Sequence, residues 1–437
     1  MRHSDLLRIP WLVWTLLMFA CSPPVRHFSL NDFCSPQCIK DNREKFERDL
    51  ISDTIHPNLS LPLNAENEPQ WESAFWAMEL MLYRSDSLKE RLRMGLADFE
   101  NRSDSFRRAI LEAAYCLYPA DFSAEMEAIA RQTRHPKLFA MAALYVTRNA
   151  PARTSEFERL LKTQFPDQLD HPIISRLQRS LAATAPDNVA ERPPLSELLR
   201  HSFVVGKPVI FSMQRQNRDY PGLVIIKKAD GAFVRNADGA IFHVSQLARS
   251  ISNLPGYITN GSTPQGVFSI QGIGQSDNDF IGPSPNIQLV MPWEAPVSQY
   301  FHGNAGLGSA WSRDIYQGLL PDSWKEYAPI YEAFDAGAAG RTEIIAHGTT
   351  INPEFYRGLP WFPNTPSLGC LTALEFWSAE TGRTIYSDQI ALVSAFLSAG
   401  SETGFLVVVE IDAQNRPVAI EDVIVDVLQP EHAHPVY

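Results

Sequence analysis

Residues 186–194 read Pro-Asp-Asn-Val-Ala-Glu-Arg-Pro-Pro, and this stretch divides a chain whose two halves have different sequence patterns. A polar, proline-rich composition is typical of a linker or an exposed connection. We therefore expect a linker at residues 186–197, between a helical domain at residues 42–185 and a β-rich domain at residues 198–437.

The half before the linker has helical periodicity. Apolar residues recur at intervals of three and four in segments that begin at Phe75, Phe106 and Leu138. The last two segments each lead into a second amphipathic stretch, which gives a weak repeat of about 31 residues. Stacked helical hairpins and an irregular helical bundle are both consistent with this pattern. His, Cys and carboxylate side chains do not gather here, so we expect a module that positions the protein or binds a partner protein.

The half after the linker alternates apolar runs with turn residues, which predicts strands. The predicted strands are residues 208–214, 222–226, 266–270, 287–291, 343–346 and 405–410. Asp230-Gly231 is a hairpin signal, and helical patterns return at residues 323–335, 374–378 and 387–397. The predicted fold class is multidomain α and β: an all-α, repeat-like domain of helical hairpins followed by a β-rich domain with a few helices.

The composition is that of an ordinary globular protein. Of 437 residues, 45% are hydrophobic and 20% are charged, which suits two or three domains of about 150 residues each. The 38 basic and 50 acidic residues leave a net charge of −12. Such a charge repels a polyanion, so nucleic acid is excluded as a partner.

The N-terminus resembles a targeting signal. Arg2 and Arg8 precede an apolar run, residues 9–20, that is too short to span a bilayer. The run ends at Ala20-Cys21, as in bacterial lipoprotein signals, which implies a signal peptide at residues 1–20, lipid attachment at Cys21 and a tether at residues 21–41. An ordinary cleaved signal, and hence a secreted protein, is the alternative. Both place the mature chain outside the cytoplasm, and the first places it on the periplasmic side of the cell envelope, anchored to the membrane.

Four cysteines besides Cys21 would then lie in an oxidising compartment. Cys34 and Cys38 are candidates for a local disulfide, because no second Cys or His pair stands nearby at metal-ligand spacing. Cys116 lies in an apolar stretch where an inert buried thiol is expected. A disulfide between Cys116 and Cys370 is also conceivable.

Two short motifs in the β-rich half suggest chemistry. Residues 344–349 (Ile-Ile-Ala-His-Gly-Thr) place His347 at the end of an apolar strand, and residues 366–372 (Pro-Ser-Leu-Gly-Cys-Leu-Thr) place Cys370 at the expected start of a helix. A helix N-terminus favours a thiolate. A nearby imidazole converts a thiol with a pKa of about 8.5 into an efficient nucleophile. Taken alone, this pair is better explained by a buried structural Cys and a surface His.

Four motifs, taken in their order along the chain, make the interpretation of His347 and Cys370 more specific. They are Thr263-Pro264-Gln265-Gly266-Val267-Phe268, Met291-Pro292-Trp293, His347-Gly348-Thr349 and Ser367-Leu368-Gly369-Cys370-Leu371. In order and approximate spacing, residues 200–410 resemble the catalytic domain of the L,D-transpeptidase (YkuD-like) family. The resemblance does not extend to the helical half.

The resemblance implies roles for individual residues. Cys370 would be the nucleophile, His347 its base, and the carbonyl of Gly348 the group that orients the imidazole. The N–H groups of Gly369 and Cys370 are the expected oxyanion donors. Further candidates on the substrate side are Ser367, Thr349, Thr372, His302, Trp361, Tyr356 and Arg357. This chemistry requires no metal and no organic cofactor.

Two positions depart from the family pattern. Leu368 stands where the family usually has a second His, and Thr372 stands where it often has Arg or Asn. An Arg guanidinium is the usual bidentate partner of a carboxylate. Arg341, Arg357 and Arg383 could supply that charge from elsewhere, although a solvated surface position is the alternative for each.

The implied activity is L,D-transpeptidation of peptidoglycan stem peptides through a thioester on Cys370, giving 3→3 cross-links or attached protein. A cysteine L,D-carboxypeptidase or amide hydrolase acting on the same stems is the first alternative. A non-catalytic wall-binding lipoprotein is the second. On each interpretation the helical domain is free to bind another envelope protein.

Overall fold

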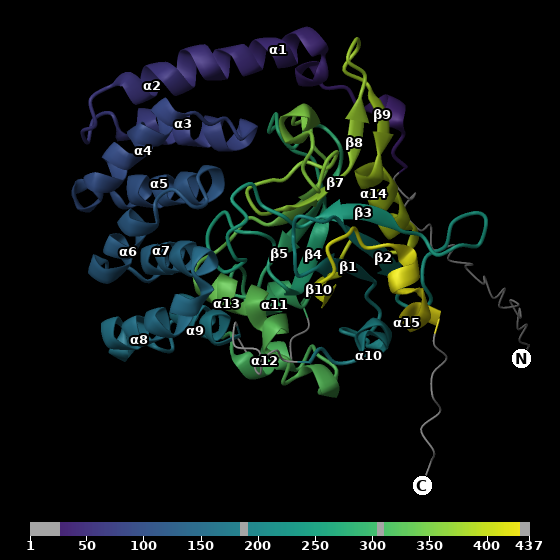
Figure 1. The fold of residues 1–437 in the computed structure, drawn as a ribbon. Helices are drawn as coiled ribbons and strands as arrows, with labels where there is room; N and C mark the ends of the chain where they lie inside the picture. The colour runs from purple at the N-terminus through teal and green to yellow at the C-terminus, as the bar shows by residue number, and fades with distance from the viewer. Residues whose placement is uncertain (1–26, 184–190, 304–309, 429–437) are drawn as a thin grey trace, which may run out of the picture.

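The computed structural model describes residues 27–183, 191–303 and 310–428. The predicted signal peptide and the predicted lipid site at Cys21 lie outside these residues, as do residues 186–190 of the predicted linker. Within them, a helical region precedes a β-rich region built on a closed eight-stranded barrel (Figure 1). The predicted order of an all-α half followed by a β-rich half is thus confirmed.

The helical region is a stack of helical hairpins. Its helices are α1 (Lys40–Asp49), α2 (His56–Ser60), α3 (Glu68–Met81), α4 (Asp86–Ala97), α5 (Asp104–Leu117), α6 (Ser123–Gln132), α7 (Pro136–Asn149), α8 (Thr154–Gln164) and α9 (Pro172–Ala183). In Figure 1, α3, α5, α7 and α9 form the layer next to the barrel, and α4, α6 and α8 form the outer layer. Of the two arrangements that the sequence left open, the structure has the stacked hairpins.

Local sequence explains where these helices begin. Ser85 and Ser103 cap α4 and α5, because each hydroxyl accepts a backbone N–H from the first helical turn. Pro136 and Pro172 occupy the first positions of α7 and α9, where the missing N–H has no cost.

The barrel closes in the strand order β1-β10-β4-β5-β6-β7-β3-β2. The strands are β1 (Val209–Arg215), β2 (Gly222–Lys227), β3 (Val244–Leu247), β4 (Gly266–Gly274), β5 (Asn286–Val290), β6 (Ile345–His347), β7 (Leu371–Ala373) and β10 (Gly404–Asp412), while β8 (Glu375–Trp377) and β9 (Thr384–Ser387) form a separate hairpin. The pairs β1–β10 and β6–β7 are parallel, and the other barrel pairs are antiparallel.

The barrel strands are apolar on both faces because both faces are covered. On β10, Leu406 and Val408 belong to a core shared with the helical region, whereas Phe405, Val407 and Val409 pack on the other side. This explains why residues 405–409 read as a continuous apolar run. The helices of this region are α10 (Leu195–Arg200), α11 (Val297–Tyr300), α12 (Arg313–Gln317), α13 (Glu332–Ala338), α14 (Asp388–Ser398) and α15 (Ile424–Leu428).

Two predicted boundaries differ from the structure. Helix α10 begins at Leu195, inside the predicted linker, and its leucines are buried beside the barrel. In the predicted tether, Phe33 and Cys38 pack against Trp377 and Ile390, so the described part of that segment is held on the β-rich region.

Polar contacts also join the two regions. Arg176 on α9 and Asp335 on α13 form an ion pair with an N–O distance of 2.5 Å, and both side chains are largely buried. The Tyr356 hydroxyl donates to the carbonyl of Leu80 on α3 at 2.8 Å. No helix among the described residues has the length and apolar character needed to cross a membrane.

Candidate active site

His347 and Cys370 are brought together by the parallel pairing of β6 and β7. Ala346 pairs with Leu371 and His347 with Thr372, so Cys370 lies beside Ile345. Residues two apart on a strand point to the same face. The side chains of His347 and Cys370 therefore share one face of the sheet, offset by two residues along the strands.

The imidazole of His347 is held by its own loop. Its Nδ1 lies 2.5 Å from the carbonyl oxygen of Gly348, and this contact requires Nδ1 to carry the proton. The other ring nitrogen, Nε2, is thereby left as an acceptor. The residue is only 4% exposed, and this burial lowers the pKa of His347 to about 4.

The thiol of Cys370 faces the start of β6. Its Sγ lies 3.5 Å from the backbone N of Ile345, which donates to it, and 3.5 Å from the carbonyl oxygen of Glu343. Burial raises the pKa of the Cys370 thiol, although the Ile345 N–H and the charge of Arg341 oppose this effect. The thiol and the imidazole are therefore both neutral at rest.

The expected helix after Cys370 is absent. Residues 371–373 and 375–377 are strands β7 and β8, so no helix dipole acts on the thiol. The nearby positive charge comes instead from Arg341, which is 5% exposed. Its guanidinium donates to the carbonyls of Gly256, Gly261 and Ser262. Burial lowers the pKa of Arg341 to about 10, so the group is still cationic at neutral pH.

The loop before Cys370 is fixed by two hydroxyl groups. Ser367 Oγ accepts the N–H of Gly369 and donates to the carbonyl of Cys370, both at 2.9 Å, and Thr263 Oγ1 donates to the carbonyl of Gly369 at 2.9 Å. The N–H of Gly369, an expected oxyanion donor, is thus already engaged with Ser367. Thr263 links the Thr-Pro-Gln-Gly motif to the Cys370 loop.

Thr349 and Thr372 take part in hydrogen bonds that link the loops of the site. Thr372 Oγ1 donates to the carbonyl of Thr365, and Thr365 Oγ1 donates to Thr349 Oγ1, both at 2.7 Å. The N–H of Thr349 donates to buried Glu375 at 2.8 Å. These threonines position the loops that carry His347 and Cys370.

Four other candidates lie away from the thiol. Tyr356 and Trp361 are buried and pack against each other, and Arg357 is exposed in an ion pair with Glu354. His302 lies against β4 and β10, where its Nε2 contacts Ser269 Oγ and the carbonyl of Gly404. None of these four side chains lines the cavity that contains His347 and Cys370.

A cavity of about 280 Å³ connects the reactive groups to the surface. Its wall includes His347, Cys370, Ser367 and Leu368 from the β-rich region, and Trp76 and Leu80 from α3. The helical region therefore forms one side of the candidate active site. The separation of the two halves in the sequence gave no indication of this.

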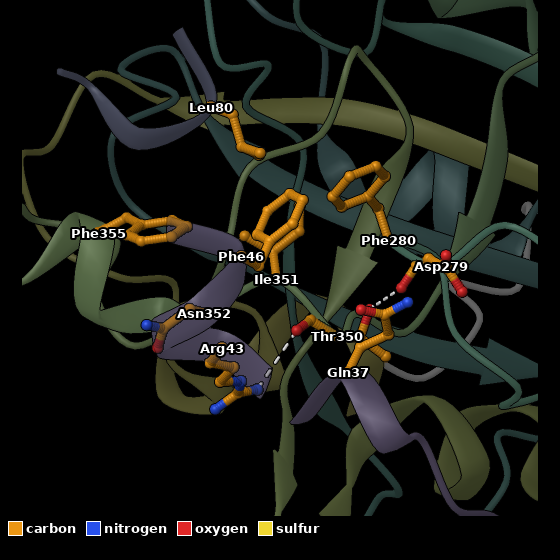
Figure 2. Close-up of a pocket in the computed structure, with 10 residues that line it drawn as sticks. All are labelled: Gln37, Arg43, Phe46, Leu80, Asp279, Phe280, Thr350, Ile351, Asn352 and Phe355. Atoms are coloured by element: carbon orange, nitrogen blue, oxygen red, sulfur yellow. Dashed lines mark hydrogen bonds between the residues drawn. The ribbon is translucent and has the colours of Figure 1, made fainter. Parts of the chain in front are cut away.

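A second cavity, of about 210 Å³, adjoins the first. The two share Leu80, Phe280 and Ile351, and Figure 2 shows Arg43 and Gln37 near Thr350, with the rings of Phe46, Phe280 and Phe355 farther along the wall. Arg43 Nη2 donates to the carbonyl of Thr350 at 3.3 Å, its Nε has no partner, and it forms no ion pair within the described residues.

Sequence reasoning missed Arg43 and Glu375. Arg43 lies on α1, more than half the chain away from Cys370, and only the fold brings it to this surface. The three arginines that the sequence offered as carboxylate partners have other contacts. Arg341 donates to three backbone carbonyls, Arg357 pairs with Glu354 on the surface, and Arg383 donates to the carbonyl of Asn31.

The cysteines Cys34, Cys38, Cys116 and Cys370 are all free thiols. Cys34 contacts the carbonyl of Thr381, Cys38 that of Thr350 and Cys116 that of Ile251. Neither disulfide considered from the sequence is formed. Among the described residues, no group of three or more His, Cys, Asp or Glu side chains could hold a metal ion.

Comparison with known proteins identifies no relative. No family model, no curated protein and no solved structure matches the chain.

Proposed function

We propose that the chain is an L,D-transpeptidase of the YkuD-like type, which acts on peptidoglycan stem peptides through a thioester on Cys370. The observation that carries the proposal is the shared cavity of His347 and Cys370, with the His347 Nδ1 proton held by the Gly348 carbonyl. The order and spacing of the four sequence motifs support the same assignment.

The neutral resting pair suits a general-base mechanism. As the Cys370 sulfur attacks the carbonyl of the third, L-centred residue of a tetrapeptide stem, its proton passes to Nε2 of His347. The bond between that carbonyl carbon and the nitrogen of D-Ala breaks, and the imidazolium returns the proton to the departing amine. The product is a thioester on Cys370 and free D-Ala.

The acceptor completes the reaction. An amine of a neighbouring stem attacks the thioester carbonyl and loses a proton to His347, and the C–S bond breaks to regenerate the thiol. The result is a 3→3 cross-link. In this mechanism the backbone N–H of Cys370 would donate to the oxyanion, and Arg43, which lines the adjoining cavity, is available for a substrate carboxylate.

The test combines intact-protein mass spectrometry with analysis of the soluble products. Incubation with disaccharide tetrapeptides should add a tripeptide-stem mass to wild type and generate 3→3 dimers. Cys370→Ala should show neither product, and His347→Gln should slow both. Cys116→Ala is the matched control, because its thiol lies elsewhere, and it should behave as wild type.

Other products would overturn this assignment. Tripeptides without dimers would indicate the hydrolase alternative. A mass spectrum without any adduct and unchanged stems would indicate the non-catalytic alternative.

We also propose that the chain works at the periplasmic side of the envelope, anchored through Cys21. Labelling with radioactive palmitate should mark wild type and leave Cys21→Ala unmarked. Unlabelled wild type would indicate a secreted protein.

A further inference from the structure

A third cavity lies between the helical region and the loop that carries Cys370. It measures about 480 Å³, and its wall includes Glu79 on α3, Arg108 and Glu112 on α5, and Asn260 from the β-rich region. It shares Trp76, Asn260 and Leu368 with the cavity of His347 and Cys370. Since Leu368 is two residues before Cys370, the two cavities adjoin each other at the loop that carries the thiol.

Glu79 is a buried carboxyl without a partner. It is 5% exposed and lines the cavity, and its carboxyl group makes no hydrogen bond or ion pair to any described residue. A buried carboxylate in this state is costly unless a cation or a proton compensates for it. Burial and the adjacent Glu112 raise the pKa of Glu79, and the charge of Arg108 only partly offsets them.

Glu112 is paired with Arg108 and Asn260, and the charge of Arg341 also acts on it. Its Oε2 accepts from Arg108 Nη1 at 2.8 Å and from Asn260 Nδ2 at 3.1 Å. Burial raises the pKa of Glu112 to about 7 even with these partners. Of the two neighbouring carboxyls, only Glu112 has an ion pair among the described residues, with Arg108, and the cavity of about 480 Å³ has room for a further positive group.

We propose that this cavity binds the ammonium group of the substrate peptide, at the end of the side chain of the residue whose carbonyl Cys370 attacks. The proposal rests on the proposed function for the attacked residue. Glu79 and Glu112 would accept charge-assisted hydrogen bonds from the ammonium. Phe75 and Trp76 line the same cavity and would cover the methylene groups of the side chain. The helical region then acts as a specificity element of the active site.

Binding of two matched probes to the full chain tests this assignment. Nα-acetyl-L-lysinamide carries the ammonium, and Nα-acetyl-L-norleucinamide has a similar chain without it. We expect calorimetry at neutral pH to show that wild type prefers the lysine probe by about tenfold or more. Equal affinities, or no detectable binding of the lysine probe, would overturn the proposal without any variant being needed.

Substitutions at Glu79 and Glu112 test whether these two carboxyls cause the preference for the lysine probe. Glu79→Gln and Glu112→Gln should each reduce the lysine preference severalfold and leave norleucine binding unchanged, because the amide keeps the shape and removes the charge. The control Glu90→Gln, on outer helix α4, should keep the wild-type preference. An undiminished preference in the Glu79→Gln Glu112→Gln double variant would contradict the assignment.

Thioester formation on Cys370 separates the two proposals. Lysine preference without any thioester would reject the transpeptidase and keep the ammonium site. Thioester formation without lysine preference would reject only the ammonium site.

Discussion

The carboxylate of Glu375 occupies the space beside Gly348 where any other residue would place its Cβ atom. It accepts the N–H of Thr349 at 2.8 Å and the hydroxyl of Ser387 at 2.6 Å. Since the carbonyl of Gly348 holds the His347 imidazole, Glu375 positions the candidate base through this loop. Burial raises the pKa of Glu375 from its ordinary 4.5 to about 7.

This relationship predicts a pH-dependent effect of Glu375→Gln on stability. As the pH rises from about 4.5 to 7, the unfolded chain releases the Glu375 proton before the folded chain does, so wild type loses stability in this window. The pKa shift of Glu375 corresponds to a loss of up to about 3 kcal/mol in the free energy of unfolding of wild type. Glu375→Gln avoids this loss because its amide does not titrate. Urea unfolding of both proteins across this window should show their difference growing in favour of the variant. The control Glu380→Gln, in the exposed β8–β9 turn, should follow wild type, and a constant difference for Glu375→Gln would contradict the prediction.

Gly369→Ala should be much more damaging than Gly358→Ala. Both glycines have positive φ, +122° and +86°, but a Cβ at position 369 would lie 2.6 Å from the carbonyl oxygen of Gly261, whereas position 358 has open space. We expect a loss of about 1 kcal/mol for Gly358→Ala, from backbone strain alone, and about 3 kcal/mol or more for Gly369→Ala. Chemical denaturation measures both, and equal losses would show that the loop before Cys370 can relax.

Arg341→Met should make Cys370 less reactive. The buried guanidinium stabilises the thiolate, so its removal should raise the pKa of the Cys370 thiol further. Each unit of increase slows alkylation by about tenfold at pH values below the pKa. Peptide mapping after iodoacetamide treatment over a pH series gives the rate at Cys370 itself. Arg341→Lys should stay closer to wild type because it keeps the charge, and the control Arg357→Met should alkylate at the wild-type rate. An unaltered alkylation rate across the pH series in Arg341→Met would contradict this electrostatic role.

The sequence predicted the elements whose pattern is local. The apolar runs at residues 209–214, 222–226 and 405–410 became β1, β2 and β10, and the helical pattern at residues 387–397 became α14. The segment at residues 374–378 was wrongly predicted as a helix. It is too short to distinguish the helical period of about 3.6 residues from the strand period of two. The pairing of β8 with β9 decides its structure.

The candidate site likewise contains some residues that the sequence can predict and others that only the fold identifies. His347 and Cys370 could be selected because each stands in a compact motif with glycine beside it. Arg43, Glu79, Glu112 and Glu375 stand in no motif, and each becomes relevant only through contacts across the fold. For Glu79, Glu112 and Glu375 the one signal in the sequence is a charged residue between apolar neighbours, as in Met78-Glu79-Leu80, which indicates a buried charge but does not identify its partner. Arg43 stands between Asn42 and Glu44 and has no such signal.

The neutral resting pair at Cys370 makes a final prediction about His347. Because burial lowers the pKa of His347 to about 4, its imidazole should stay neutral far below the usual titration range near 6.5. NMR of protein labelled at histidine Cε1 can follow the titration, with the signal assigned through His347→Gln. The folded chain takes up this proton later than the unfolded chain as the pH falls, so wild type should lose up to about 3 kcal/mol relative to His347→Gln between about pH 6.5 and 4. A signal that titrates near or above 6.5 would instead mean a resting thiolate–imidazolium pair or an exposed ring, and proton transfer during attack would then not be the step that activates Cys370.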